Sequence, residues 1–183
     1  GYTPSSIIEF VKAAGVSKAF SIVDIGMLEH FVRDELNYSA PRRIAVIDPI
    51  KVVVDNYPEG KTETFKVANN PNDENAGMRE VTFSRELYID RADFLKEKVG
   101  KFFRMYPGGE VRLMSAYIVK CTGFDEDENG NVTAIHVDAD LETGSNMPAD
   151  GRKVKGTIHW LSTENCFDCE VAEVDKLFTI ENT

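Results

Sequence analysis

Residues 110–138 read EVRLMSAYIVKCTGFDEDENGNVTAIHVD, and this stretch places the chain in the β class. Two runs rich in β-branched residues flank the polar segment 127–131. Its Asn129-Gly130 pair is the strongest short-range signal of a β-hairpin, because both residues tolerate a positive φ at the centre of a tight turn. The sequence therefore predicts an antiparallel hairpin here.

Outward from this hairpin, other segments show the same extended pattern. After Pro41, β-branched residues dominate residues 44–54, which we interpret as the first strand. Clusters of Gly, Pro, Asn and Asp separate the further candidates. These lie near 63–67, 79–89, 110–120, 131–138, 153–161 and 170–175. Six or seven short antiparallel strands predict a barrel or a sandwich.

Helical periodicity occurs in three places. Residues 3–14 have Thr3 as a capping residue and Pro4 in the first turn, and residues 24–37 carry apolar side chains at three- to four-residue spacing. A third helix is predicted over 91–106, between strands, and closed by Pro107-Gly108-Gly109. The change of period near residue 40 predicts a helical subdomain over 1–40 and a β domain over 41–183.

Composition limits the possible partners and compartments. The 31 acidic residues outnumber the 21 basic ones and give a net charge of −10, which argues against a general nucleic-acid binder and requires any RNA contact to be local. Three cysteines in 183 residues argue against a disulfide framework and for the cytoplasm. No apolar run approaches the roughly 20 residues of a membrane-spanning helix.

Residues that could carry chemistry have simpler interpretations. Cys166 and Cys169 form a C-x-x-C pair, but a closed zinc site needs two more ligands at comparable spacing. Asp90 and Asp93 lie at a predicted strand-to-helix junction, where aspartates commonly cap free backbone N–H groups. We therefore predict no catalytic residue and no metal ligand.

Basic residues lie close to aromatic ones in one part of the chain. Lys98, Lys101 and Arg104 share the third predicted helix with Phe103 and Tyr106. Cations beside aromatic rings are typical of single-stranded RNA binding, although a solvated charged face is the more frequent meaning of such residues. Further basic residues lie in other segments: Arg42, Arg43, Arg112, Arg152, Lys153 and Lys155.

Taken in order, five segments of the chain resemble the glutaminyl-tRNA synthetase family of class I aminoacyl-tRNA synthetases. The resemblance covers nearly the whole chain and depends on specific blocks rather than on composition. The blocks are GYTPSSIIEFVKAAGVSK at 1–18, APRRIAVIDPIKVVVDNYPEG at 40–60, FSRELYIDRADF at 83–94, EVRLMSAYIVK at 110–120 and PADGRKVKGTIHWLS at 148–162.

The resemblance implies a non-catalytic, tRNA-binding fragment. Residues 1–40 would be the helical part that contacts the tRNA stem, and residues 41–183 the proximal anticodon-binding β-barrel, of a kind also found in a ribosomal protein. The barrel would be incomplete at its C-terminal end, with an unpaired strand edge. ATP and Mg²⁺ would be handled by a catalytic domain whose signatures this chain lacks, so no cofactor is expected here. The partner would be glutamine tRNA, not DNA or a membrane, and the parent enzyme would be a monomer.

Site residues follow from the same resemblance. Arg42 matches a contact to the middle anticodon base, Arg104 a contact to the third base and Arg112 a contact to the first, and Asn72 matches another anticodon-loop contact. Lys101 belongs to the same anticodon-binding set, where the bacterial pattern has glutamine. Phe103 stands where that pattern has lysine.

Three other functions stay open at this point. The region could belong to a related glutamyl-tRNA synthetase, which binding to tRNAs differing only in the anticodon would distinguish. It could be a general β-barrel that binds structured RNA, or an interaction module for another partner, which competition by an isolated anticodon stem-loop would distinguish. An independent hydrolase using Asp90 or Asp93 is the most remote of the three.

Overall fold

The computed structural model describes residues 2–18, 21–148 and 150–175. These form two compact units: a helical unit that ends at Arg43 and also takes in residues 67–79, and a sheet unit formed by residues 44–66 and those from 80 onward. Within the described residues, no helix is long and apolar enough to cross a membrane.

The first unit contains the two predicted N-terminal helices. Helix α1 spans Pro4–Ala14; the Thr3 side chain accepts from the Ser6 N–H, and Gly15 ends the helix at a φ of 71°. Helix α2 spans Ile25–Ser39, with Asp24 as its N-cap. The Glu35 carboxylate in α2 accepts hydrogen bonds from the Thr3 and Ser5 hydroxyls, which lowers its pKa and ties the two helices together.

The second unit is a seven-stranded sheet in the order β8-β5-β6-β7-β1-β4-β9. Its strands are β1 (Pro49–Val54), β4 (Glu86–Asp90), β5 (Glu110–Leu113), β6 (Ile118–Glu126), β7 (Val132–Ala139), β8 (Thr157–Ile158) and β9 (Leu161–Ser162). A separate two-stranded ribbon pairs β2 (Glu63–Ala68) with β3 (Met78–Phe83). The expectation of purely antiparallel strands was wrong, because β1 pairs with β7 and β5 pairs with β8 in parallel.

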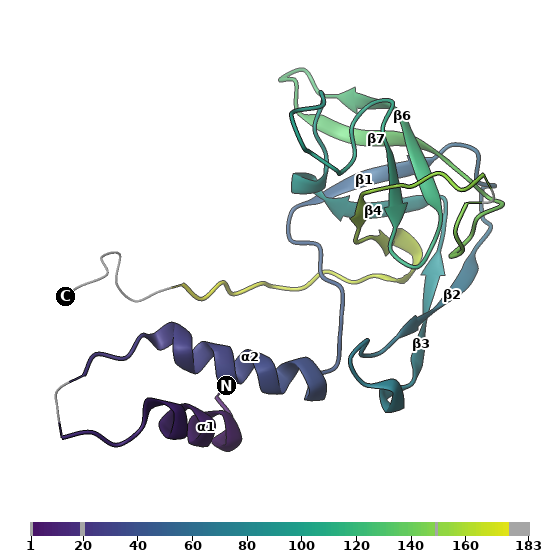
Figure 1. Cartoon of the computed structure of the whole chain (residues 1–183). Coiled ribbons are helices and arrows are strands. Elements are labelled where there is room, and N and C mark those ends of the chain that lie inside the picture. Colours follow the sequence, from purple (N-terminus) through teal and green to yellow (C-terminus); the bar gives the residue numbers. More distant parts are fainter. Residues whose placement is uncertain (1, 19–20, 149, 176–183) are drawn as a thin grey trace. The chain divides into compact units, whose positions relative to one another are not determined.

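The sheet curls until its two edges come close together (Figure 1). Strands β8 and β9 lie at opposite edges, yet only His159 and Trp160 separate them in the chain. Two residues span at most about 10 Å of extended chain, so a flat sheet could not have this order. The expected barrel is therefore confirmed as a curled sheet with open edges. A single segment, residues 157–162, supplies the strand at each edge.

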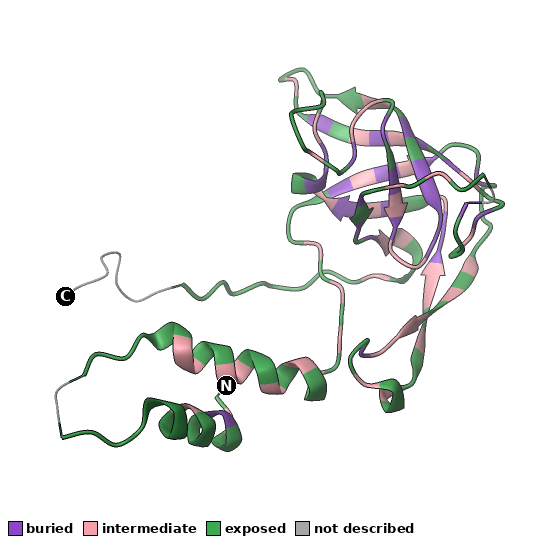
Figure 2. Cartoon of the chain, viewed as in Figure 1, coloured by how far each residue is buried: buried purple, intermediate pink, exposed green. Residues whose placement is uncertain are grey.

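Aromatic side chains fill the inside of the curled sheet. Phe83 is fully buried and makes edge-on contacts with Tyr57, Phe65, Tyr117 and Trp160, at centroid distances of 5.1 to 6.0 Å. The hydroxyls of the two buried tyrosines donate to one carboxylate oxygen of Glu63, and burial raises both tyrosine pKa values. Figure 2 shows the buried residues concentrated on the strands, whereas the helices are mostly exposed or intermediate.

The predicted hairpin is confirmed as β6 and β7, but its turn differs from the expected one. Gly130 has a φ of 77°, whereas Asn129 does not have a positive φ. The Asp127 carboxylate instead accepts from the backbone N–H groups of Asn129 and Asn131. The aspartate thus organises the turn, and only one residue needs the left-handed conformation.

The predicted helix over 91–106 was wrong. Only a single turn of 3₁₀ helix, η2 (Arg91–Asp93), forms there, and a loop follows it. Phe94 and Met105 meet through an isolated bridge and are both buried, so the two ends of the loop are fixed to the core. Gly100, with a φ of 50°, interrupts the apolar periodicity that had suggested the helix.

Several predicted strands also have different limits. Residues 44–48 and 170–175 form no strand. Segment 110–120 divides into β5 and β6 at a tight turn where Ser115 has a φ of 60°, and segment 79–89 divides between β3 and β4. Segment 153–161 contributes only β8 and the first residue of β9. The predicted strands were too long because residues that favour strands continue through these short turns.

Candidate anticodon-binding surface

The five predicted RNA-binding residues lie in both units. Arg42 and Asn72 belong to the helical unit, and Lys101, Arg104 and Arg112 belong to the sheet unit. The structure brings the first two together and places two of the other three on one loop.

Arg42 and Asn72 both contact the C-terminal end of α2. Arg42 Nη2 donates to the Asn37 carbonyl oxygen at 2.9 Å, and Asn72 Nδ2 donates to the same oxygen at 3.3 Å. The last carbonyls of a helix have no partner inside the helix and carry its partial negative charge, so a guanidinium is well suited to this position. Both side chains are therefore held where the chain leaves the helix.

Asn70 completes this arrangement and was not predicted. It is buried, and its Nδ2 donates to the carbonyl oxygens of Asn37 and Tyr38, each at 3.0 Å. Its Oδ1 accepts from the Asn72 N–H at 2.9 Å, which fixes the backbone of the predicted contact residue. The residues around Asn70 predicted only a turn, with no indication that one asparagine would be buried.

Arg104 is the most exposed of the three predicted arginines, and its side chain is held in place at one end. The side chain is 50% exposed, and Nη1 pairs with the Asp93 carboxylate, which is only 8% exposed. Asp93 is buried, and its backbone carbonyl oxygen accepts from the Met105 N–H at 2.9 Å. It is therefore a fixed anchor for the guanidinium. Asp90 and Asp93 were both predicted as caps: Asp90 takes that role and accepts from the Ala92 N–H, whereas Asp93 pairs with Arg104.

Lys101 lies two residues before Phe103 in an exposed part of the same loop. It forms no ion pair with any residue that the structure describes. Phe103 itself is 47% exposed, and the Lys155 Nζ lies 5.1 Å from the centre of its ring. Lys98 Nζ lies 5.4 Å from the Tyr106 ring in the same loop. We call Lys98, Lys101, Phe103, Arg104, Tyr106 and Lys155 the Phe103 surface.

Arg112 has fewer N–H donors available for a ligand than Arg104 has. Its Nη1 donates to the carbonyl oxygens of Ala116 and Gly144, and its Nη2 donates to that of Asn146 at 2.7 Å. These bonds fix the loop after β7 to the turn between β5 and β6. A guanidinium has five N–H donors, so two remain for a ligand.

Arg152 shows what a wholly structural arginine looks like in this chain. Its guanidinium contacts the carboxylates of Glu110, Asp140 and Asp150 at 3.3, 2.6 and 2.7 Å. These carboxylates raise the Arg152 pKa further and surround the cation with more negative charge than it can neutralise. An RNA phosphate would be repelled there.

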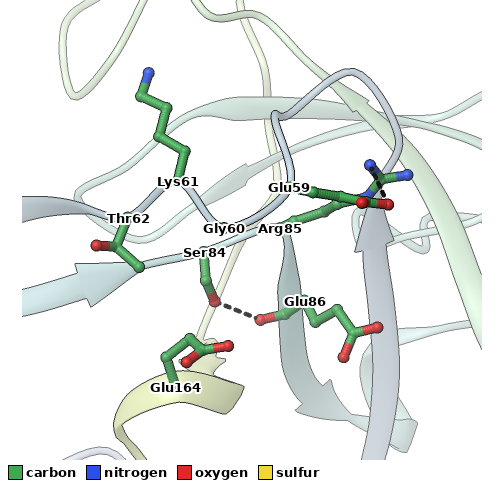
Figure 3. A pocket seen from close by; sticks show the side chains of 8 residues that line it. All are labelled: Glu59, Gly60, Lys61, Thr62, Ser84, Arg85, Glu86 and Glu164. Carbon is green, nitrogen blue, oxygen red and sulfur yellow. Dashed lines mark hydrogen bonds and ion pairs between the residues drawn. The ribbon is translucent and has the colours of Figure 1, made fainter.

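A pocket of about 300 Å³ lies elsewhere on the sheet unit and contains none of the predicted residues (Figure 3). Three glutamates, one lysine and one arginine line it, and Arg85 pairs with Glu59 at 3.3 Å. Ser84 Oγ at its floor donates to the Glu86 carbonyl oxygen at 2.7 Å. The mixture of charges gives no preference for a polyanion, so the candidate RNA contacts lie on an open surface rather than in this pocket.

His136 has partners for both ring nitrogens within the protein. His136 lies between Asp55 and Asp125, with each ring nitrogen within 3.2 Å of a carboxylate oxygen, and both carboxylates raise its pKa. Neither nitrogen is left for a metal. Among the described residues, no group of three or more His, Cys, Asp or Glu side chains could hold a metal ion. The three cysteines form no disulfide.

Comparison with known proteins identifies the family of the chain. Residues 40–140 match a family model described as the anti-codon binding domain of class I tRNA synthetases (E and Q). The matched range contains all five predicted RNA-binding residues as well as β1 to β7.

Similar curated proteins extend the match over nearly the whole chain. Glutamine–tRNA ligase of Clostridium perfringens is 56% identical over 170 residues, which is 93% of this chain and 31% of that protein. Those of Aliivibrio salmonicida and Rhodopirellula baltica are 48% and 51% identical over 100% of this chain, which covers 33% and 30% of their lengths. The chain thus spans about a third of the length of these relatives. It belongs to the family of anticodon-binding domains of class I tRNA synthetases (E and Q).

Proposed function

We propose that this chain is the tRNA-binding part of a glutamine–tRNA ligase and recognises the anticodon loop of glutamine tRNA. Arg42, Lys101, Arg104 and Arg112 would contact anticodon bases, and Asn72 would contact the same loop. Residues 1–40 would lie along the tRNA stem, and the β domain over 41–183 would bind the anticodon. The chain contributes recognition and no catalytic group.

The observation that supports this most is the setting of Arg104. A half-exposed guanidinium is anchored by a buried carboxylate through one nitrogen, so its remaining donors point from a fixed base toward solvent. Unstacked anticodon bases present their hydrogen-bonding edges individually, and a rigid planar donor group can distinguish one base from another. A mobile surface arginine would contribute charge but little selectivity.

Net charge does not contradict this role. The chain carries −10 overall, yet Lys98, Lys101 and Lys155 form no ion pair with any described residue. Cations that keep their charge beside Arg104 provide the local attraction for a phosphate backbone. Carboxylates in other parts of the chain would disfavour RNA docked at the wrong place.

The test is binding of a glutamine-tRNA anticodon stem-loop to the chain, with Arg104→Lys as the main variant. Lysine keeps the positive charge beside Asp93 but loses the planar donor group. We expect a loss of about 1–3 kcal/mol in binding free energy and relaxed selectivity at one anticodon position, measured with stem-loops altered one base at a time.

Arg104→Ala is a weaker choice because it would leave the buried Asp93 carboxylate without its partner and would destabilise the sheet unit. Arg85→Lys serves as the matched control, since that arginine pairs with Glu59 away from the predicted residues. Unchanged affinity and base selectivity in Arg104→Lys would show that Arg104 does not read a base.

The family description covers both E and Q synthetases, so a glutamyl-tRNA synthetase is the second candidate. The relatives named above are glutamine–tRNA ligases, which favours glutamine. Stem-loops that differ only in carrying a glutamine or a glutamate anticodon separate the two, and tighter binding to the glutamate anticodon would reverse the assignment. In either case the whole enzyme would use ATP with Mg²⁺ and act in the cytoplasm as a monomer, and no residue of this chain is proposed to hold the nucleotide.

A further inference from the structure

We infer that Phe103 is a stacking platform for one unpaired RNA base, with Lys155 holding the adjoining phosphate. This inference rests on the proposed function and adds to it a contact based on ring stacking rather than on base-edge hydrogen bonds. Phe103 was not among the predicted anticodon contacts, and lysine was expected at its position.

The first argument is the exposure of an aromatic ring at this point of the chain. Phe103 is 47% exposed although burial of a phenyl ring is favourable, and its neighbours Phe94 and Met105 are buried. The adjacent residue is Arg104, whose guanidinium pairs with the buried carboxylate of Asp93. A ring exposed beside an anchored guanidinium is the combination that single-stranded RNA sites use, because every base has a π-face.

The second argument is that the backbone carrying the ring is fixed. Gly156 lies so close to it that a Cβ on this residue would be 1.9 Å from the Phe103 carbonyl oxygen. The Gly156 carbonyl accepts from the Arg112 N–H at 2.8 Å, so the segment packed against the loop is itself attached to β5. A platform held in this way loses little conformational entropy when a base stacks on it.

The other aromatic ring of the surface is already covered. Gly109 packs against Tyr106 so closely that a Cβ there would be 2.7 Å from two ring carbons. Tyr106 is partly buried, whereas Phe103 is 47% exposed and has the Lys155 ammonium 5.1 Å from its ring centre. Phe103 is therefore the ring that offers a face to a ligand.

Charge identifies the ligand as nucleic acid rather than an apolar peptide. Lys155 lies over the ring and Lys101 lies two residues before it, and neither pairs with a carboxylate among the residues that the structure describes. An apolar partner would have to bury these ammonium groups without compensation. A nucleotide supplies both a base for the ring and a phosphate for Lys155.

The experiment measures binding of the glutamine anticodon stem-loop to the chain with Phe103 as wild type, Leu and Trp. We expect Phe103→Leu to raise Kd about tenfold and Phe103→Trp to retain the affinity, because leucine keeps the apolar character but not the ring. Phe167→Leu is the matched control, since that phenylalanine is 87% exposed with no basic partner described near it.

Abasic stem-loops, each lacking one loop base, identify the stacked base. At that position, removal of the base should weaken binding to the wild-type chain but not weaken binding to Phe103→Leu further. Salt dependence separates the ring from the charge. Phe103→Leu should leave the slope of log K against log salt unchanged, whereas Lys155→Ala should reduce its magnitude by about 0.7.

Wild-type binding with no difference between Phe103→Leu and Phe167→Leu would overturn the stacking inference and leave the proposed function intact. Equal losses for every abasic position in both proteins would also overturn it. Failure of the wild-type chain to bind the stem-loop at low salt would overturn both.

Discussion

Arginines of this chain differ in what their surroundings leave available. Arg152 is enclosed by three carboxylates, and Arg112 is bound to three backbone carbonyls. Arg42 uses Nη2 at a helix end, and Arg104 uses Nη1 on a buried carboxylate. The sequence shows the same residue type in all four places. The positions of the acceptors in the folded chain determine how many donors remain for RNA, and residue spacing does not reveal these.

Gly156 provides a test at the residue scale. Alanine there has no room beside the Phe103 carbonyl oxygen, so the loop or the segment must move. We expect Gly156→Ala to lower the free energy of unfolding by about 1–3 kcal/mol, as overpacking does, in chemical denaturation. The variant should also weaken binding of the anticodon stem-loop, because the Phe103 surface shifts.

Gly123→Ala is the matched control, since a Cβ there meets nothing within 4 Å. It should change the free energy of unfolding by less than about 0.5 kcal/mol and leave RNA binding as it was. A Gly156→Ala protein as stable as Gly123→Ala would contradict the close packing of the loop.

At the scale of elements, prediction succeeded where local signals were complete. Both N-terminal helices have a capping residue at the start and an apolar face, and both form within two residues of the predicted limits. The helix predicted over 91–106 failed because its apolar residues serve tertiary contacts: Phe94 and Met105 bridge to each other, and Gly100 breaks the run. Long-range pairing of this kind leaves no periodicity in the sequence.

The C-terminal end of α2 gives a prediction for an element. Asn70 contacts two of its last carbonyls and fixes Asn72. We expect Asn70→Ala to lower the free energy of unfolding by about 1–3 kcal/mol, because the Asn37 and Tyr38 carbonyl oxygens lose a donor. Faster amide hydrogen exchange in the last turn of α2 would measure the loss. RNA binding should also weaken, because Arg42 and Asn72 share the same carbonyl.

Asn75→Ala is suitable as the control. Asn75 is exposed, and its backbone N–H rather than its side chain makes the bond to Asp73. If both variants behave alike in the exchange experiment, the helix end does not depend on Asn70.

At the scale of the whole chain, composition argued against a general nucleic-acid binder and a disulfide framework. The order of five sequence segments indicated the family. A net charge of −10 gives no sign of RNA binding, and the cations of the Phe103 surface come from two segments about 50 residues apart. Runs of β-branched residues and turn residues predicted a barrel or a sandwich, and the family resemblance implied the barrel. They could not show that β8 and β9 lie at opposite edges of one sheet, because a two-residue strand has no pattern of its own.

The approach of the two sheet edges therefore depends on a segment of six residues, 157–162, which includes Trp160. Trp160 is 1% exposed, packs edge-on against Phe83 at 5.2 Å and donates from Nε1 to the Met114 carbonyl oxygen at 3.0 Å. We expect Trp160→Ala to lower the free energy of unfolding by about 3–5 kcal/mol. The loss should appear at both edges, since β8 and β9 share this anchor. Hydrogen exchange should show it at the β8 edge in the Arg112 and Met114 amides, which donate to the Gly156 and Ile158 carbonyl oxygens.

Phe124→Ala separates this effect from a general loss of stability, because Phe124 packs edge-on against Phe94 at 5.5 Å, whereas Trp160 packs against Phe83. In Phe124→Ala the protection of all strands should fall together. In Trp160→Ala the β5–β8 and β4–β9 pairings should lose protection before β6 and β7 do. If only one edge opened, β8 and β9 would be separate attachments, and Lys155 would depend on β8 alone to stay over Phe103. If both opened together, the same tryptophan that keeps the two edges near each other would also hold the proposed base-stacking platform in place.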